Sequence, residues 1–241
     1  MLSAARKEEL TGFLKKLNIE KTDVELLDVA LTHPSFNFEK NKENQPDYER
    51  LEFLGDSVVR LVVSEYLFDK HQNFDEGKLT KIRSYLVSDE FFSKVSQRLG
   101  IGKLLNIGVH EAKDGGRTKE SILACALEAL FGAVFKSLGF EKARKFVSSL
   151  YDEIDIDVNS ILYMYNSKEL LQQYTQGKNK DLPEYHLVSE TGQAHCKTYE
   201  INVVYHGEIL GSGVAAQKKE AEKIAAYNAI KKLNLISKHS I

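Results

Sequence analysis

The stretch Tyr48-Glu49-Arg50-Leu51-Glu52-Phe53-Leu54-Gly55-Asp56-Ser57 places acidic side chains inside an apolar helical pattern. Glu49, Glu52 and Asp56 follow spacings of three and four residues, so all three project from one face of the expected helix. Like charges at these spacings repel each other by roughly 0.2–0.5 kcal/mol per pair. A divalent cation would offset that repulsion, because carboxylate oxygens are the ligands that Mg²⁺ prefers. The stretch therefore predicts either a metal-binding helix face or an acidic face in water.

Apolar side chains accompany these carboxylates along the same helix. They favour a helix that is largely enclosed by protein, and they therefore favour the metal-binding alternative over a solvated acidic face. The apolar residues are Leu51, Phe53, Leu54, Val58, Val59 and Leu61.

The segment Glu49-Arg50-Leu51-Glu52-Phe53-Leu54-Gly55-Asp56-Ser57 resembles the signature of the ribonuclease III family, whose members are Mg²⁺-dependent endonucleases of double-stranded RNA. The resemblance also includes a C-terminal region and covers nearly the whole chain. It implies hydrolysis to 5′-phosphate and 3′-hydroxyl ends with short 3′ overhangs, in the processing of rRNA and mRNA. Its further segments are Leu31–Phe36, Glu76–Thr80, Ile82–Ser88 and Glu120–Ala124.

The same resemblance assigns the acidic residues to roles. In the family, a second helix faces the signature helix and brings an Asp-x-x-Glu pair, and Glu128 matches the glutamate of that pair. The resemblance implies that Asp56 and Glu128 are catalytic, that Glu52, Asp56 and Glu128 bind Mg²⁺, and that Mn²⁺ can substitute. No small-molecule cofactor is expected. Glu49 and Glu76 match further acidic positions and are expected to be secondary.

Cys125 stands where the family has the aspartate of the metal centre. A thiol with an ordinary pKa near 8.5 is mostly neutral at pH 7, and sulfur is a poor partner for Mg²⁺. Three alternatives remain open: catalysis with weaker metal binding, RNA binding without efficient cleavage, or a substitution introduced to trap a complex. Without the family, Cys125 would be interpreted as a small buried residue.

The composition sets limits on compartment and partners. The formal net charge is −2, so contacts with RNA must come from local basic clusters. Two cysteines, Cys125 and Cys196, do not make a disulfide framework and indicate a reducing compartment. Met1 to Leu10 lacks the apolar core of a signal peptide, and no run approaches 18 apolar residues. We expect a cytoplasmic protein with no membrane contact.

The chain divides into two expected domains. Residues 3–153 show helical periodicity throughout and are predicted to be all-α, with an exposed loop at 37–47. The resemblance implies that they form the nuclease and dimerisation domain. Residues 154–165, which overlap an acidic run from Asp152 to Asp157, are predicted to be a linker, although a last helix of the first domain is an alternative. Residues 166–235 are predicted to form a small α+β domain of order α-β-β-β-α, which resembles a double-stranded RNA-binding domain.

Polar and basic residues of the second domain are candidates for RNA contact. Double-stranded RNA presents its shape, 2′-hydroxyls and phosphates, so a suitable domain needs minor-groove contacts and a phosphate clamp. The resemblance places Gln173 and His195 at the minor groove. Lys218, Lys219 and Lys223 open the last helix, where lysines and the helix dipole attract phosphate. The alternative is a solvated helix face, and Ala215-Ala216-Gln217 is a weak cap for that helix.

The resemblance also implies a homodimer in which Phe53 inserts into the partner, with each subunit cutting one strand. The competing hypothesis is a non-catalytic or cleavage-impaired relative that binds double-stranded RNA, which Cys125 keeps open. A helical dimer module without any RNA role is disfavoured by the lysine-bearing second domain.

Overall fold

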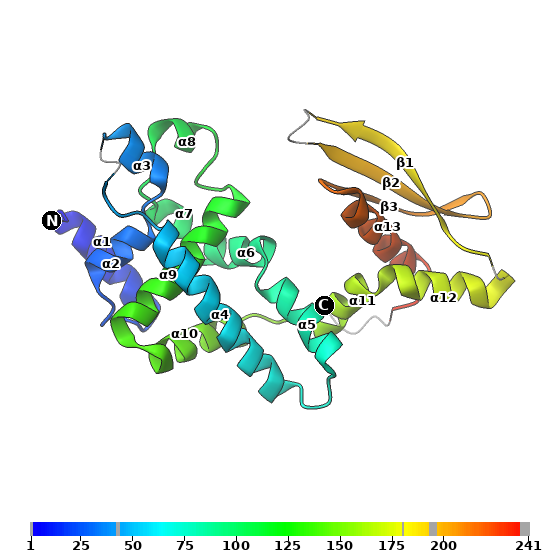
Figure 1. Ribbon diagram of the computed structural model, residues 1–241, viewed down its shortest axis with the longest axis horizontal. Coiled ribbons are helices and arrows are strands. Elements are labelled where there is room, and N and C mark those ends of the chain that lie inside the picture. Colours follow the sequence, from blue (N-terminus) through cyan, green and yellow to red (C-terminus); the bar gives the residue numbers. More distant parts are fainter. Residues whose placement is uncertain (1, 42–43, 180, 193–196, 237–241) are drawn as a thin grey trace. The chain divides into compact units, whose positions relative to one another are not determined.

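The computed structural model describes residues 2–41, 44–179, 181–192 and 197–236, which form two compact units, Met1–Ile156 and Asp157–Ile241 (Figure 1). The described part of the first unit is helical, with one isolated bridge between Thr32 and Asn106, so the all-α prediction is confirmed. Its helices are α1 Ala4–Lys16, α2 Val24–Ala30, α3 Pro34–Glu39, α4 Glu49–Lys70, α5 Glu76–Leu86, α6 Asp89–Leu99, α7 Ile101–Leu104, α8 Val109–Lys113, α9 Glu120–Leu138 and α10 Phe140–Asp152.

Helices α4 and α9 cross at two glycines. A Cβ atom on Gly55 would lie 1.7 Å from the carbonyl oxygen of Glu128, and one on Gly132 would lie 2.2 Å from that of Leu51. Any larger residue would therefore push the two helices apart. This close crossing brings the acidic face of α4 against the middle of α9.

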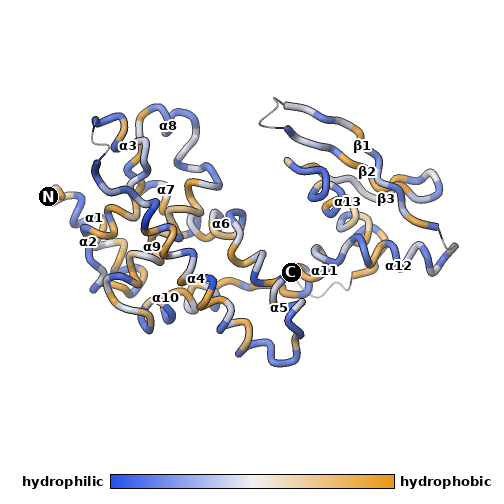
Figure 2. Tube along the Cα trace, in the orientation of Figure 1, coloured by the Kyte–Doolittle hydropathy of each residue, from blue (hydrophilic) through white to orange (hydrophobic). Residues whose placement is uncertain are grey.

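Helix α9 is the central core helix of the first unit. It is long and apolar enough to cross a membrane by length and composition alone, which the sequence analysis did not anticipate. However, 61% of its most apolar window is buried inside the protein. Figure 2 shows the apolar stretches of α9 surrounded by other helices. Its composition is therefore explained by burial in a helical core.

The predicted loop at 37–47 is wrong at its beginning. Helix α3 runs from Pro34 to Glu39, with the His33 side chain accepting a hydrogen bond from the backbone N–H of Ser35 at its N-terminus. Asn37 is buried and donates to the carbonyl oxygens of Gln45 and Pro46. A helix of six residues, capped by the side chain that precedes it, has too little apolar periodicity to be found in the sequence.

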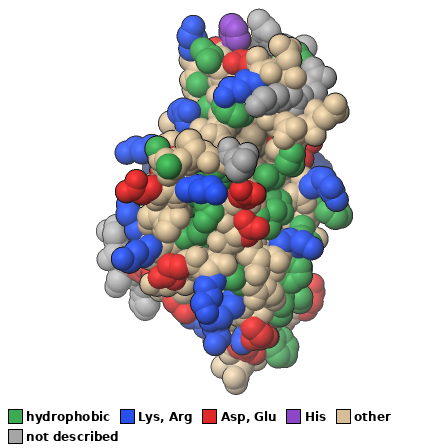
Figure 3. Space-filling model, turned by 90° about the vertical axis from the view of Figure 1, so that its left-hand side faces the viewer, with side chains coloured by type: hydrophobic (Ala, Val, Ile, Leu, Met, Phe, Trp, Pro, Cys, Tyr) green, Lys and Arg blue, Asp and Glu red, His purple; other side chains and the backbone are tan. Residues whose placement is uncertain are grey.

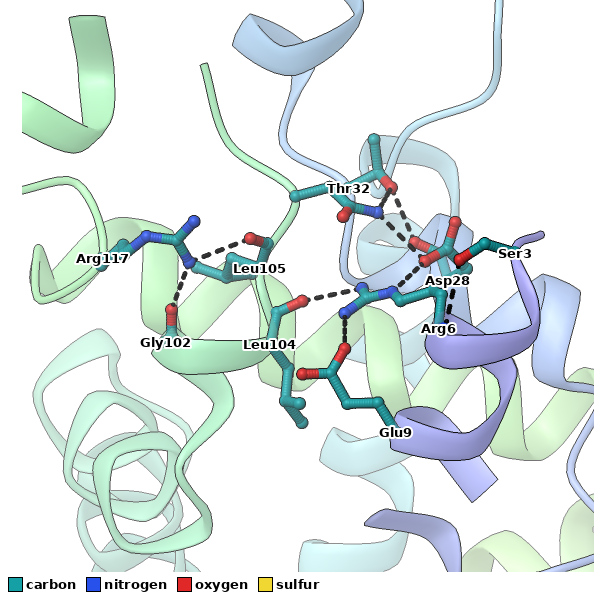
Figure 4. A network of polar contacts seen from close by, with 10 residues as sticks. Ser3, Arg6, Glu9, Asp28, Thr32, Gly102, Leu104, Leu105 and Arg117 are labelled. Carbon is teal, nitrogen blue, oxygen red and sulfur yellow. Dashed lines mark hydrogen bonds and ion pairs between the residues drawn. The ribbon is translucent and has the colours of Figure 1, made fainter. Parts of the chain in front are cut away.

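A polar network fastens the N-terminal helix to the rest of the first unit (Figure 4). Arg6 of α1 donates to the carboxylate of Asp28 and to the carbonyl oxygen of Leu104 at 2.8 and 2.7 Å. The side-chain amide of Asn106 then donates to both Asp28 and Thr32. These half-buried bonds hold three helices around the α4–α9 core.

The second unit has the predicted order of elements, preceded by one more helix. The strands form an antiparallel sheet of order β1-β2-β3, in which Leu187 pairs with Ile201 and Ile201 pairs with Gly213. The elements are α11 Val158–Tyr165, α12 Ser167–Asn179, β1 Glu184–Thr191, β2 Thr198–Tyr205, β3 Glu208–Ala215 and α13 Lys218–Lys232.

The last helix packs closely on the sheet because small residues face each other. Cβ atoms on Gly211 and Gly213 of β3 would lie 2.4 and 2.2 Å from carbonyl oxygens of α13. The facing stripe of α13 is made of buried alanines, which let the helix approach the strand. They are Ala221, Ala225, Ala226 and Ala229.

Helix α11 occupies most of the region that the sequence analysis assigned to a linker, residues 154–165. Asp157 caps the helix by accepting from the N–H groups of Asn159 and Ser160. Ile161 is buried, and Tyr163 packs against the apolar core of the second unit. The acidic cap and the apolar face that follows it therefore make α11 part of the second unit.

Charged side chains of both signs are intermixed on the face shown in Figure 3. This agrees with the net charge of −2. Contacts with a polyanion must therefore come from local clusters of lysines.

Candidate active site and RNA-binding face

The crossing of α4 and α9 gathers four of the predicted acidic side chains around one open hollow. Its volume is about 470 Å³. It is lined by Glu49, Glu52, Phe53, Asp56 and Glu128. The prediction that Glu128 comes from a second helix facing the signature helix therefore agrees with the geometry.

Cys125 lies one turn before Glu128 on α9 and belongs to the same cluster. Three possible ligand atoms lie within 4.8 Å of one another: a carboxylate oxygen of Glu52, the sulfur of Cys125 and a carboxylate oxygen of Glu128. All three residues are half-buried. The Cys125 thiol lies beside the Glu52 carboxylate, and each of the two groups shifts the pKa of the other. Cys125 also packs against the apolar cluster that includes Tyr48 and Ala129. It therefore sits at the border between the carboxylates and the core.

Burial and mutual repulsion shift the pKa values of these groups in one direction. Burial, followed by the charges of Asp56 and Glu52, raises the pKa of Glu128 to about 8. Burial also raises the pKa of Glu52, against the hydrogen bond from Cys125. Burial and the hydrogen bond to Glu52 raise the pKa of the Cys125 thiol to about 12. A cluster of this kind binds a cation favourably, because the cation relieves the repulsion.

Two charged residues at this site were not recognised as site residues in the sequence. Asp89, in the first turn of α6, raises the pKa values of Glu52, Cys125 and Glu128 by its negative charge. Arg60 donates to Asp56 at 2.6 Å and partly neutralises it. Asp89 stands at the start of a helix, and Arg60 follows Asp56 by one helical turn, so residue type and local spacing give neither of them a signal of its own in the sequence.

Glu76 is not brought to the hollow within the described residues of one chain. It opens α5 and accepts a hydrogen bond from the Thr80 hydroxyl at 2.9 Å. Glu49 lines the hollow at the start of α4, whereas Glu76 is not among the described residues that line it. The two secondary acidic residues are thus in different places.

One face of α4 exposes a row of large apolar side chains. Phe53, Leu61 and Phe68 are 79%, 58% and 69% exposed, at spacings of eight and seven residues. These spacings keep the three on one side of the helix. Large apolar side chains exposed along one side of a helix, beside the acidic hollow, are the form expected of an interaction surface.

The candidate RNA-binding residues of the second unit differ in their environments. Gln173 is exposed on α12, and its amide donates to Glu169 at 3.3 Å. Lys218 and Lys219 are both exposed, and Lys218 also lies over the Tyr199 ring and 3.9 Å from Glu190. His195 lies outside the described residues.

Lys223 is the most enclosed of the three lysines. Its side chain is only 20% exposed and lies 2.8 Å from Glu220. Its ammonium also lies 4.7 Å from the centre of the Tyr165 ring, at the end of α11. Lys218 and Lys219 are therefore better placed for phosphate than Lys223. The expected weak cap at Gln217 is confirmed, because its side chain caps no N–H of α13.

Comparison with known proteins agrees with both units. A model of the Ribonuclease-III-like family matches residues 23–154, and a model of the double-stranded RNA binding motif matches residues 167–233. The protein therefore belongs to the class of helical nucleases that carry a separate domain for double-stranded RNA.

Relatives extend over almost the full chain. "Ribonuclease 3" of Borreliella burgdorferi is 37% identical over 96% of this chain and 94% of its own length. "Ribonuclease 3" of Nitratiruptor sp. is 40% identical over 93% and 96%. The chain belongs to the ribonuclease III family, and it is an endoribonuclease of double-stranded RNA. No observation favours the non-catalytic alternative that Cys125 had left open.

Solved structures match the first unit. The nuclease domain of ribonuclease III from Campylobacter jejuni superimposes with a TM-score of 0.55 at 38% identity, over 65% of this chain and all of that one. A second structure of that domain gives a TM-score of 0.54 at 41% identity, over 58% and 94%, and concerns flexibility in a region involved in dimer formation.

Proposed function

We propose that the centre at the α4–α9 crossing binds Mg²⁺ and hydrolyses double-stranded RNA to 5′-phosphate and 3′-hydroxyl ends. The observation that carries the proposal is the convergence of Glu52, Asp56 and Glu128 on one hollow. Three carboxylates supply the hard oxygen ligands that Mg²⁺ requires, so the donor set fits the ion. Mn²⁺ can substitute for it, because it also accepts oxygen ligands.

In this proposal, Glu52, Asp56 and Glu128 would hold the cation. When bound, Mg²⁺ polarises the phosphate under attack and lowers the pKa of the attacking water. The glycine crossing holds the carboxylates of α4 at a fixed distance from Glu128 and so orients them without loop movement. Glu49 would position water at the edge of the hollow, and Glu76 would act, if at all, from elsewhere.

We further propose a homodimer through the exposed apolar row of α4. Phe53 is 79% exposed although it lines the hollow, and Leu61 and Phe68 continue the row. A partner helix over this row would bury all three side chains. Two centres on one duplex would then cut both strands and leave 3′ overhangs of about two nucleotides, set by the geometry of the minor groove.

The second unit is proposed to hold the duplex through Lys218 and Lys219 at the start of α13, with Gln173 and His195 at the minor groove. Exposed lysines beside free N–H groups at a helix N-terminus attract phosphate. We place the protein in the cytoplasm, where rRNA and mRNA precursors supply such duplexes. Lys223 would contribute mainly by holding α11 through Tyr165.

The cleavage assay compares a long RNA duplex, the same single strand and a DNA duplex of the same sequence, each with Mg²⁺ and with EDTA. We expect cleavage of the RNA duplex alone, only with Mg²⁺, and products that a 5′-phosphate-dependent exonuclease can degrade. Cleavage in EDTA, or of single strands at an equal rate, would overturn the proposal.

The dimer is tested by sedimentation of the full chain at micromolar concentration, next to the Phe53→Ser variant. We expect a dimer for the wild type and a larger share of monomer for the variant. A monomeric wild type would contradict the homodimer.

A further inference from the structure

The proposed metal centre has a mixed set of donors. Oxygen atoms of Glu52 and Glu128 and the sulfur of Cys125 lie within 4.8 Å of one another. Donors around a tetrahedral Zn²⁺ are about 3.5 Å apart, for a Zn–S bond of about 2.3 Å and Zn–O bonds of about 2.1 Å. Side-chain movements of about one ångström would therefore bring all three donors onto one ion of this kind.

Oxygen and sulfur donors select different cations. Mg²⁺ requires near-octahedral oxygen ligands, whereas thiolate selects softer ions such as Zn²⁺. Zn²⁺ also accepts three protein ligands of mixed type and keeps a fourth position open. The negative charge of Asp56 and Asp89 around this cluster attracts any divalent cation. Among these side chains, only Cys125 distinguishes a soft cation from a hard one.

We propose that this centre binds thiophilic divalent cations of the Zn²⁺ class through Cys125, Glu52 and Glu128, in competition with Mg²⁺. The proposal rests on the proposed function, because it takes the same centre as the metal site. On binding, the S–H bond of Cys125 breaks, a sulfur–metal bond forms, and the proton passes to solvent. A cation held in this way occupies the place of Mg²⁺, so it inhibits cleavage.

Cys125 lies at the border between the carboxylates and the apolar core. The thiol packs beside Tyr48 and Ala129, and its sulfur lies within 4.8 Å of a carboxylate oxygen of Glu52. The sulfur is therefore within reach of the carboxylates while the side chain contacts the apolar core. Binding therefore exchanges one partner of Glu52, the thiol, for a cation that Glu52 and Cys125 share.

The test uses Cd²⁺ as a soft probe on the full chain without RNA or Mg²⁺, because cadmium–thiolate bonds absorb in the ultraviolet. A Cys196→Ser background removes the second thiol. We expect an absorption band that saturates at one Cd²⁺ per chain and that is absent from Cys125→Ser and Cys125→Ala versions. No band in the Cys196→Ser protein would overturn the proposal.

A second comparison separates a metal centre from a thiol that binds Cd²⁺ alone. Glu128→Gln should weaken Cd²⁺ binding at least tenfold, whereas Glu120→Gln, on an exposed part of the same helix, should leave it unchanged. Equal affinities in these two variants would overturn the proposal. Thermal melting of each variant without metal shows that the compared proteins are folded.

The competition is measured as inhibition of Mg²⁺-dependent cleavage by Zn²⁺. Wild type should be inhibited at Zn²⁺ concentrations at least tenfold lower than Cys125→Asp. Cleavage with Mg²⁺ but no cadmium–thiolate band would overturn this inference and leave the proposed function standing. A band in a protein that cuts no RNA with any metal would instead overturn the proposed function.

Discussion

The two units place their functional residues in opposite positions relative to their cores. In the first unit, Glu52 and Glu128 lie half-buried at the crossing of two core helices. Folding brings their carboxylates together, so their mutual repulsion opposes folding. In the second unit, Lys218 and Lys219 are exposed at a helix end, and buried alanines on another face of that helix make the packing. We therefore expect stability and function to be coupled at the proposed metal centre and separable at the proposed RNA-binding face.

The largest effect is expected from removing one carboxylate of the centre. Glu128→Gln should lower cleavage of an RNA duplex by at least about a hundredfold, because metal-ion stabilisation of phosphate chemistry contributes several kcal/mol. Duplex binding in Ca²⁺ should stay within about twofold, since phosphate contacts dominate affinity. Glu120→Gln is the control with full activity. Equal cleavage by both variants would show that Glu128 is not a ligand.

The glycine crossing should couple packing to activity. Gly55→Ala places a Cβ atom against the carbonyl oxygen of Glu128, and we expect a loss of about 3 kcal/mol in unfolding free energy together with impaired cleavage. Gly12 of α1 has no atom near its Cβ position, so Gly12→Ala should stabilise by about 0.5–1 kcal/mol. Urea denaturation measures both. A harmless Gly55→Ala would contradict the tight crossing.

The second unit should lose binding without losing stability. Replacing both Lys218 and Lys219 by alanine should weaken duplex binding about tenfold and lower the slope of log affinity against log salt by about one to two. Lys231→Ala, at the other end of α13, is the matched control. Salt titrations of binding on several RNA sequences give both quantities. A loss confined to one sequence would argue against phosphate contacts.

A smaller effect concerns stability against pH in metal-free protein. Glu128 has a folded pKa of about 8 against an ordinary value of 4.5, so the folded state holds a proton that the unfolded state releases. Its contribution to stability therefore falls as pH rises from 4.5 to 8. Glu128→Gln removes this fall, and its denaturation midpoint in EDTA should decline less between pH 5 and 9. Parallel curves would show an unshifted pKa.

The sequence predicted the elements better than the contacts between them. The acidic face of α4 and the order α-β-β-β-α follow from local periodicity, so both could be found without tertiary information. The approach of Asp89 to Glu128, and of Tyr165 to Lys223, joins segments far apart in the chain and leaves no local pattern. Helix α11 was only an alternative in the sequence, as a last helix of the first domain, because its acidic cap resembled a solvated linker.

Cys125 shows the same limit at a single position. The resemblance to the family identified it as the departure from the metal centre, but residue type alone left open a buried core residue. Its place beside the Glu52 carboxylate and its packing beside Tyr48 show that both descriptions apply to one side chain. Cys125 has this double environment because α4 and α9 cross, and the crossing leaves no local pattern in the sequence.

The most direct test of the metal centre is a Mg²⁺ titration of duplex cleavage by wild type and Cys125→Asp, with RNA binding measured in Ca²⁺. Aspartate adds a hard anionic ligand beside Glu52 and Glu128, so the variant should need about tenfold less Mg²⁺ for half-maximal cleavage, or about 1.4 kcal/mol. RNA affinity should remain within about twofold, because it comes mainly from phosphate contacts. An identical Mg²⁺ dependence in both proteins would show that position 125 is outside the metal centre, and no cleavage by either would contradict the endonuclease itself.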